Sequence, residues 1–424
     1  MERYKNPLSR LMGSEKKLVQ NFLVLAASQS INLLIPLLIT PFLVAKLGVD
    51  RFGVVFFCQV VSIYLLVVID YHYNLLGVKE LAQHRDDPDF VNRLLSRAIA
   101  TRLLLLLLCS LVLFGIANFF PLLQEHRRIA YWSFALLLGQ FLLSPWLYQG
   151  LGELNALAAI IVMSKSCYVI SALIFVQNPA DYYLPNVLLG GSNAVFGAVG
   201  LLYLSVSHRL RLTLPALSAI VGELKDGSHI FASNIAISVY SNTSTVILGL
   251  VGDPIMVGYF AVAERLVAVC RGFMTVFFQV TFPRLSHVSL QGRNAIGQLL
   301  KSVYVPFTLL LGSLCLGMFF FSDGIAYYFV RANGTPEVAR LLKLYSVVPF
   351  LVCLNIPFYQ LLLIYNHSKA YSAVLIAASV LMVGSSVVLT ENYGLMGSVS
   401  AIVLTELFVT ISLVYLARMK YQLV

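Results

Sequence analysis

The sequence predicts an all-α polytopic membrane protein with about 12 transmembrane helices in two six-helix bundles related by a pseudo-two-fold axis along the membrane normal. Three observations predict this class. The composition is strongly apolar, long apolar segments alternate with short polar loops, and sequence features recur in the same order in both halves of the chain.

The composition excludes an ordinary soluble protein. Of the 424 residues, 59% are hydrophobic and 11% are charged, and the mean hydropathy is +0.84. Soluble domains carry about 45–50% apolar and about 25% charged residues. A soluble fold of this length could not bury so many apolar side chains, so we expect a bilayer to surround them.

The candidate spans divide equally between the two halves of the chain. A transmembrane helix needs about 20 apolar residues, whereas barrel strands alternate over about 10. The first half offers segments 19–45, 53–77, 98–119, 129–149, 156–176 and 184–206. The second half offers 229–251, 255–281, 303–322, 342–365, 371–390 and 395–417. These lengths predict helices.

The distribution of Lys and Arg predicts the orientation. The N-terminal stretch is basic, and the loop after the second span carries Lys79, Arg85, Arg93 and Arg97. Alternating assignment gives this side about 18 basic residues and the other side about seven, so both termini should be cytoplasmic. The net charge of +10 then reflects topology and attraction to anionic membrane lipid, and we expect no nucleic-acid partner.

The N-terminus and the cysteines indicate no further processing or metal chemistry. The first 17 residues are charged and do not resemble a signal peptide. The cysteines all lie in apolar segments without metal-ligand spacing: Cys58, Cys109, Cys167, Cys270, Cys315 and Cys353. We expect packed thiols and no cofactor.

The chain divides into two related halves at a basic stretch. We expect a cytoplasmic segment at 1–18, an N-terminal bundle at 19–206, a linker at 207–228, a C-terminal bundle at 229–417 and a tail at 418–424. The glycine-bounded turn at 47–53 matches the turn at 251–258, and 145–149 matches 357–360, both beginning with Pro and ending with Gln. Six helices per half give the copies a common orientation, which predicts two bundles facing across a cleft and alternating access.

Polar side chains mark the first and seventh spans at helical spacing. Asn21 and Asn32 lie in the first span, and Asn234 and Asn242 lie in the seventh. Such stripes form either hydrogen bonds between helices or the wall of a hydrated cavity. Because both equivalent helices carry one, we favour a cavity.

Ionisable residues within the spans predict a binding site, because such groups are costly in a membrane and usually face a cavity or pair with each other. The eighth span carries Glu264, Arg265, Arg271 and Gln279, and the fifth carries Lys165. The small excess of cations, to which Arg102 adds, suits an anionic head group. The separation of Glu264 and Arg271 argues against a direct ion pair.

Two acids leave alternatives open. Asp70 either lines the cavity, with a possible role in coupling, or is neutralised by a neighbouring helix. Glu406 either exchanges a proton or braces Lys165. The chain shows no phosphate-binding GxxxxGK[ST] loop and no HExxH motif, so energy should come from an ion gradient or from the substrate's own gradient.

A series of short motifs resembles one family across the whole chain. The motifs, in order, are Asn21 with the region 36–41, Leu47-Gly48 with Phe52-Gly53, Ile69-Asp70-Tyr71, Ala263-Glu264-Arg265-Leu266 and Phe282-Pro283-Arg284. They resemble Wzx-type O-antigen flippases of the multidrug/oligosaccharidyl-lipid/polysaccharide exporter superfamily. Two positions depart from the family pattern: Arg265 replaces the more usual Lys, and His72 replaces the glycine of an Asp-Tyr-Gly-Phe motif.

The resemblance implies a non-enzymatic function at the bacterial inner membrane. Members of the family flip an undecaprenyl-pyrophosphate-linked oligosaccharide from the cytoplasmic to the periplasmic leaflet. Antiport driven by a proton gradient is consistent with this transport. A polysaccharide polymerase and a chain-length regulator are the partners that the family implies.

Three alternatives remain beside this interpretation. A multidrug exporter would share the fold but should have an acidic, aromatic site without a basic excess. A peptidoglycan-precursor flippase has a similar head group but usually a longer chain. A membrane-bound polysaccharide polymerase usually needs a larger outer loop than 322–341, the longest one here.

Overall fold

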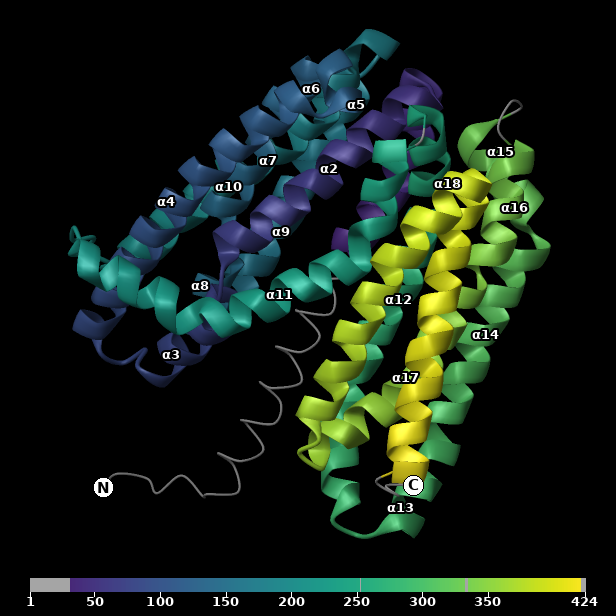
Figure 1. Ribbon diagram of the computed structural model, residues 1–424. Helices are drawn as coiled ribbons and strands as arrows, with labels where there is room; N and C mark the ends of the chain where they lie inside the picture. The colour runs from purple at the N-terminus through teal and green to yellow at the C-terminus, as the bar shows by residue number, and fades with distance from the viewer. Residues whose placement is uncertain (1–30, 252, 332–334, 421–424) are drawn as a thin grey trace, which may run out of the picture.

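The computed structural model describes residues 31–251, 253–331 and 335–420, and within these ranges it contains helices and no strand. Two helical bundles pack together at one end and diverge toward the other (Figure 1). The N-terminal bundle runs from purple to teal and the C-terminal bundle from green to yellow. The predicted all-α membrane fold is confirmed.

The N-terminal bundle is built from the first half of the chain. Its helices are Ile31–Leu47, α2 (Val49–Asp70), η1 (Tyr73–Gly77), α3 (Val78–Gln83), α4 (Pro88–Phe119), α5 (Pro121–Glu125), α6 (Arg127–Trp132), α7 (Phe134–Leu143), α8 (Pro145–Leu151), α9 (Leu154–Phe175), η2 (Pro179–Tyr183) and α10 (Leu184–Ser207).

The second half of the chain forms the connecting helix and the C-terminal bundle. Its helices are α11 (Leu217–Val251), α12 (Pro254–Ser289), α13 (Arg293–Leu299), η3 (Leu300–Tyr304), α14 (Val305–Phe320), α15 (Ser322–Val330), α16 (Thr335–Tyr345), α17 (Val347–Ile364), α18 (Ser368–Tyr415) and η5 (Leu416–Lys420).

Ten helical stretches in the described ranges are long and apolar enough to cross a membrane. They account for eleven of the predicted spans, because 371–390 and 395–417 both fall within α18. Gly394, with φ 56° and ψ −134°, interrupts α18, and a Cβ atom on Gly397 would lie 1.8 Å from the Leu389 carbonyl oxygen. The chain therefore reverses here and forms two spans. The first predicted span is described from residue 31 onward, as the helix Ile31–Leu47.

Local sequence explains where several long helices begin. Both α4 and α12 start at a proline, whose missing N–H and fixed φ suit the first helical position. Asp87 and Asp253 precede these prolines, and each side chain accepts hydrogen bonds of 3.1 Å from backbone N–H groups of the first turn. These caps satisfy donors that would otherwise lack partners at a helix start.

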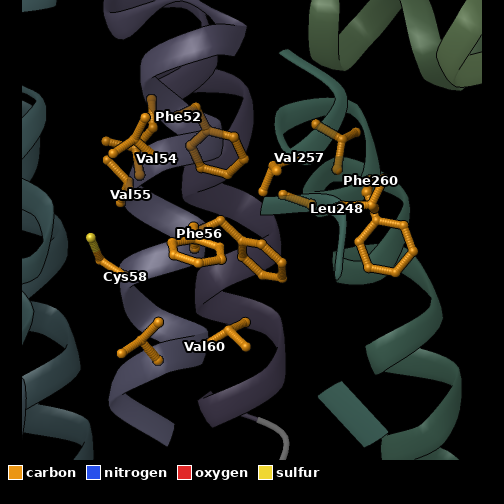
Figure 2. Close-up of a cluster of buried hydrophobic side chains, with 14 of the residues drawn as sticks. Phe52, Val54, Val55, Phe56, Cys58, Val60, Leu248, Val257 and Phe260 are labelled. Carbon is orange, nitrogen blue, oxygen red and sulfur yellow. The ribbon is translucent and has the colours of Figure 1, made fainter. Parts of the chain in front are cut away.

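The two bundles meet along α2, α11 and α12, a contact surface that we call the seam. Phe52 and Phe56 of α2, Leu248 of α11 and Val257 of α12 belong to one cluster of buried side chains there (Figure 2). The apolar contact joins the bundles at the end where they converge.

Two glycines allow the backbones of α2 and α12 to touch at the seam. A Cβ atom on Gly53 would lie 2.1 Å from the Pro254 carbonyl oxygen, and one on Gly258 would lie 2.2 Å from the Val49 carbonyl oxygen. Val49 and Pro254 each begin a helix, and each glycine lies four positions later. The contacts are therefore reciprocal, as a two-fold relation between equivalent helices requires.

Helix α11 connects the two halves. It packs against α2 and α4 of the N-terminal bundle and against α18 of the C-terminal bundle (Figure 1). The predicted linker at 207–228 is helical from Leu217 onward, so the second half of that stretch is continuous with the seventh span.

Candidate functional site

Arg265 of α12 reaches across the seam to α2. Its Nη2 atom donates a hydrogen bond of 2.5 Å to Gln59 Oε1, and its guanidinium lies 5.1 Å from the ring centre of Phe56. Gln59 Nε2 donates in turn to Asn186 Oδ1 at 2.9 Å, and Asn186 Nδ2 donates to Ser133 Oγ at 2.9 Å. This chain of side chains fixes the amide that orients Arg265.

Arg265 has no carboxylate within ion-pair distance in the described ranges. Its Nε atom is buried and has no hydrogen-bond partner there. The neighbouring acid, Glu264, interacts with a different arginine. The guanidinium charge is therefore only partly compensated, by neutral partners.

Lys165 lies halfway along α9, close enough to Arg265 for the two positive charges to repel each other. It is half-buried, and within the described part of the chain it forms no hydrogen bond or ion pair. The adjacent Ser164 is instead bonded to Asn193, at 2.7 Å. Two cations from opposite bundles thus lie near each other, and neither forms an ion pair in the described ranges. We call Lys165 and Arg265 the seam cations.

Glu264 and Arg271 form an ion pair, which corrects the expectation from their spacing. Arg271 Nη2 donates to Glu264 Oε1, and the Tyr345 hydroxyl donates to Glu264 Oε2. Seven residues correspond to a rise of about 10 Å along a helix. The two long side chains extend toward each other and cover this distance. Arg271 is therefore neutralised, unlike Arg265.

Arg271 also borders a cavity of about 410 Å³ inside the C-terminal bundle. The lining includes Tyr240, Tyr345, Asn355 and Glu406, from α11, α16, α17 and α18. We call it the C-terminal cavity. The exposed surface of its walls is largely apolar, but half of the residues that line it carry a polar group.

Glu406 is buried at the wall of this cavity and accepts a hydrogen bond from the Tyr240 hydroxyl. The alternative in which Glu406 braces Lys165 is wrong, because Lys165 has no ion pair in the described ranges. Lys165 belongs to the N-terminal bundle, whereas every residue lining the C-terminal cavity belongs to α11 or later helices.

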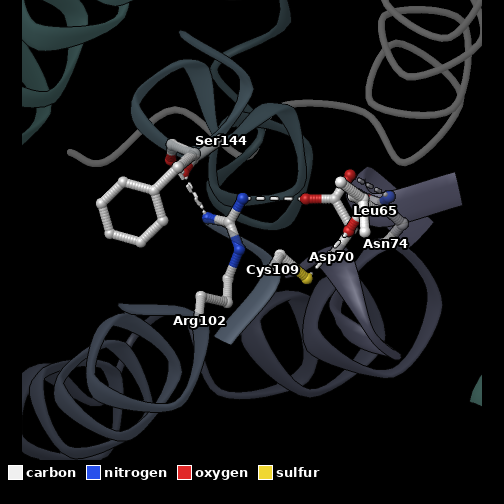
Figure 3. Close-up of polar contacts among 7 residues, drawn as sticks. Leu65, Asp70, Asn74, Arg102, Cys109 and Ser144 are labelled. Atoms are coloured by element: carbon white, nitrogen blue, oxygen red, sulfur yellow. Dashed lines mark hydrogen bonds and ion pairs between the residues drawn. The ribbon is translucent and has the colours of Figure 1, made fainter. Parts of the chain in front are cut away.

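Asp70 and Arg102 form an ion pair sealed inside the N-terminal bundle (Figure 3). Arg102 Nη2 lies 2.8 Å from Asp70 Oδ1, and Arg102 Nη1 donates to Ser144 Oγ at 2.5 Å. Asn74 Nδ2 donates to the second Asp70 oxygen at 3.2 Å. Of the two interpretations of Asp70, neutralisation by a neighbouring helix matches this geometry.

The remaining predicted residues do not converge on one point. Asn21 lies outside the described residues. Asn234 donates to the Tyr71 carbonyl and Asn242 to the Ser238 carbonyl, both at 3.1 Å. Asn32 is half-buried and Gln279 is exposed, and neither forms a hydrogen bond within the described ranges. The amides of the seventh span thus donate to backbone carbonyls.

Several polar partners were not predicted from the sequence. Gln59 and Asn186 each lie in an apolar span that carries one other amide, Asn74 or Asn193, a signal that could have singled them out. Tyr240 and Tyr345 donate hydrogen bonds to Glu406 and Glu264, but tyrosine is too common in this chain to stand out.

Metal-ligating side chains do not cluster in the part of the chain that the structure describes. No group of three or more His, Cys, Asp or Glu residues there could hold a metal ion. The cysteines are free thiols, all buried except Cys167.

A family model for "Polysaccharide biosynthesis protein" matches residues 18–289. A candidate O-antigen transporter of Escherichia coli (strain K12) is 28% identical over 407 residues, covering 96% of this chain and 98% of that protein. A second candidate O-antigen transporter, from Shigella dysenteriae, is 22% identical over 395 residues, covering 92% and 98%.

Solved structures share the fold at low sequence identity. An inward-facing multidrug resistance transporter of the MATE family, in the MOP superfamily, gives a TM-score of 0.73 at 14% identity, covering 93% of this chain and 94% of that one. The lipid II flippase MurJ, in an inward closed conformation, gives 0.71 at 13% identity, covering 95% and 88%. An outward-facing MATE transporter gives 0.62 at 16% identity, covering 94% and 95%.

Proposed function

The chain belongs to the polysaccharide biosynthesis protein family, and we propose that it moves undecaprenyl-pyrophosphate-linked repeat units of a surface polysaccharide across the bacterial inner membrane. The movement runs from the cytoplasmic to the periplasmic leaflet. The names of the Escherichia coli and Shigella dysenteriae relatives support an O-antigen substrate.

The seam cations are the observation that carries this proposal. A pyrophosphate group is a concentrated anion, which Arg binds through a planar fork of donors and Lys binds as a point charge. Arg265 and Lys165 supply one of each, from opposite bundles, and neither forms an ion pair in the described ranges. A bound pyrophosphate would replace their mutual repulsion with attraction.

Placement between the bundles suits transport by alternating access. We propose that the N-terminal bundle, 19–206, and the C-terminal bundle, 229–417, rock about the seam, with 207–228 as the cytoplasmic linker. The seam cations would then face each leaflet in turn while the lipid tail stays in the bilayer. The higher TM-score with the inward-facing MATE transporter than with the outward-facing one supports an inward-facing state here.

The positions of Lys and Arg indicate which end of the protein faces the cytoplasm in this proposal. Lys79 belongs to α3, Arg85 follows that helix, and Arg93 lies near the start of α4. Helix α3 lies at the end where the bundles diverge (Figure 1). By the distribution of Lys and Arg, this end and both termini are cytoplasmic. A cysteine introduced at Arg93 should resist a membrane-impermeant thiol reagent in whole cells and react in inverted vesicles.

Glu406 is our candidate for the coupling acid. Buried carboxylates within membrane spans commonly carry protons in transporters. Asp70 is already paired with Arg102, whereas Glu406 borders a cavity. Glu406→Gln should therefore remove the sensitivity of export to a protonophore, and export that responds as in the wild type would exclude this role.

The test of the main proposal is genetic and biochemical. A deletion strain should lose surface polysaccharide and hold its lipid-linked repeat units in the cytoplasmic leaflet. Arg265→Ala and Lys165→Ala should each reduce restored polymer at least about tenfold at equal protein level, which corresponds to about 1.4 kcal/mol of lost interaction. Arg293→Ala, an exposed arginine at the start of α13, is the matched control.

Other outcomes would contradict the proposal. Single repeat units in the periplasmic leaflet of the deletion strain would identify a polymerase. Intact polymer combined with drug sensitivity would identify a multidrug exporter. Normal export by both Arg265→Ala and Lys165→Ala would show that these two residues do not form an anion-binding site.

A further inference from the structure

We propose that the C-terminal cavity is a sugar-binding pocket, which holds a monosaccharide of the substrate while the seam cations hold its pyrophosphate. This inference rests on the proposed function and assigns a second binding region to it. The cavity, at about 410 Å³, lies within the size range of small-molecule sites, about 300–1,000 Å³.

An aromatic wall gives the cavity a surface that suits a sugar ring. Phe278, Tyr359 and Tyr371 come from α12, α17 and α18, and all three line the cavity. The rings of Phe278 and Tyr359 are stacked with centres 5.2 Å apart, and those of Tyr359 and Tyr371 are stacked at 4.3 Å. One face of a pyranose ring carries mainly C–H groups and packs against such a surface, while tyrosine hydroxyls reach its polar rim.

Two buried polar atoms at the cavity lack partners within the described residues. Asn355 is only 7% exposed, lines the cavity, and has an Oδ1 atom without a hydrogen bond. The Nε atom of Arg271, another residue of the lining, also has none. Buried polar groups are normally paired, and a ligand that offers both a donor and an acceptor would satisfy these two. Sugar hydroxyl and acetamido groups offer both.

The charge of the cavity separates its ligand from the one at the seam. Arg271 is paired with Glu264, and Glu406 is bonded to Tyr240, so the cavity has no uncompensated cation. A pyrophosphate would gain little there. A neutral, hydroxyl-rich group would gain hydrogen bonds from Asn355 and Arg271 and contact with the rings.

Thermal unfolding of the purified full-length protein tests the inference. N-Acetylglucosamine and glucose are the probes, and sorbitol at the same concentration controls for the general stabilising effect of polyols. A bound sugar should raise the unfolding midpoint in a saturable way, whereas sorbitol should raise it gradually. Asn355→Ala should lose at least about tenfold in apparent sugar affinity. Asn392→Ala, which removes an exposed amide from α18, should bind as the wild type does.

Tyr359→Phe is a second variant for the case in which Asn355→Ala fails to fold. It removes only the hydroxyl and keeps the stacked ring. Saturable stabilisation of the wild type that is weakened in either variant supports the pocket. Equal stabilisation by sugar and sorbitol would overturn it. Stabilisation by tetraphenylphosphonium instead of a sugar would also overturn it and identify a site for lipophilic cations.

Export in cells separates this inference from the proposed function. If the cavity holds a sugar, Asn355→Ala should impair export at equal protein level, as Arg265→Ala does. Loss of export in Arg265→Ala with normal export in Asn355→Ala would reject the sugar pocket and leave the flippase proposal standing. Normal export in Arg265→Ala and Lys165→Ala would contradict the flippase proposal itself.

Discussion

The Asp70–Arg102 pair of the N-terminal bundle and the Glu264–Arg271 pair of the C-terminal bundle join the same two chemical groups in different surroundings. The side chain of Arg102 is 1% exposed and that of Asp70 is 12% exposed. The corresponding values for Arg271 and Glu264 are 35% and 19%, and Arg271 lines a cavity. The first pair is enclosed by protein, and the second is accessible to a ligand.

This difference teaches that a charged residue within a span does not by itself indicate function. Arg102 has its charge balanced by Asp70 and donates further to Ser144, and although its Nε atom has no partner in the described residues, its side chain is only 1% exposed, so no substrate reaches it. Arg271 is also balanced, but its side chain is 35% exposed and lines the C-terminal cavity. Arg265 forms no ion pair within the described residues. The three arginines therefore form a series, from Arg102, which is enclosed and neutralised, through Arg271, to Arg265, which is available to bind an anion.

The largest expected effect is the loss of one member of the sealed pair. Asp70→Ala leaves the Arg102 charge buried without its acid, which should destabilise the protein by about 3–5 kcal/mol. Thermal unfolding of the detergent-purified protein, together with its level in the membrane, measures this. Unfolding within about 1 kcal/mol of the wild type would show that water reaches Arg102 and would end the contrast between the two pairs.

Removing both charges of the sealed pair should cost much less than removing one. The double variant Asp70→Leu with Arg102→Met replaces the pair with apolar side chains of similar size, a change that is often neutral. We expect it to recover most of the stability lost in Asp70→Ala and to support export. If the double variant folds but fails to export, one of the two residues has a role in transport beyond neutralisation.

The accessible pair should tolerate loss of its acid better. Glu264→Gln keeps a hydrogen-bond acceptor for Tyr345, and the cavity lets water or a ligand solvate Arg271. We expect a loss of about 1–2 kcal/mol, smaller than for Asp70→Ala. The same unfolding measurement compares the two. An equal loss would indicate that the C-terminal cavity is closed to solvent.

The fold could be predicted from the sequence because it depends on properties summed over long segments. An apolar stretch of about 20 residues predicts a span whatever its neighbours are. The reciprocal contacts of Gly53 and Gly258 lie within the two glycine-bounded turns that the sequence had already matched. Even the reversal inside α18 falls in the predicted gap between 390 and 395.

The candidate site could be predicted only as a set of residues. The apolar residues around Glu264, Arg265 and Arg271 show that all three are within a span. The direction of the side chains decides which of the two arginines pairs with the acid. The C-terminal cavity was beyond prediction for a related reason. Its lining comes from helices that are distant in sequence, and a polar atom is identified as unpartnered only when all its neighbours are known.

The smallest expected effect concerns a third ion pair, exposed at the surface. Lys343 Nζ lies 3.1 Å from Asp323 Oδ2, and their side chains are 39% and 69% exposed. Water screens both charges, and holding two flexible side chains together costs entropy, so Lys343→Ala should change stability by no more than about 0.5 kcal/mol. Unfolding at low and high salt measures this, because the wild-type contribution should shrink further as salt rises. If Lys343→Ala lost as much stability as Glu264→Gln, the contribution of the three ion pairs would depend on the distance between the charges and not on their access to solvent.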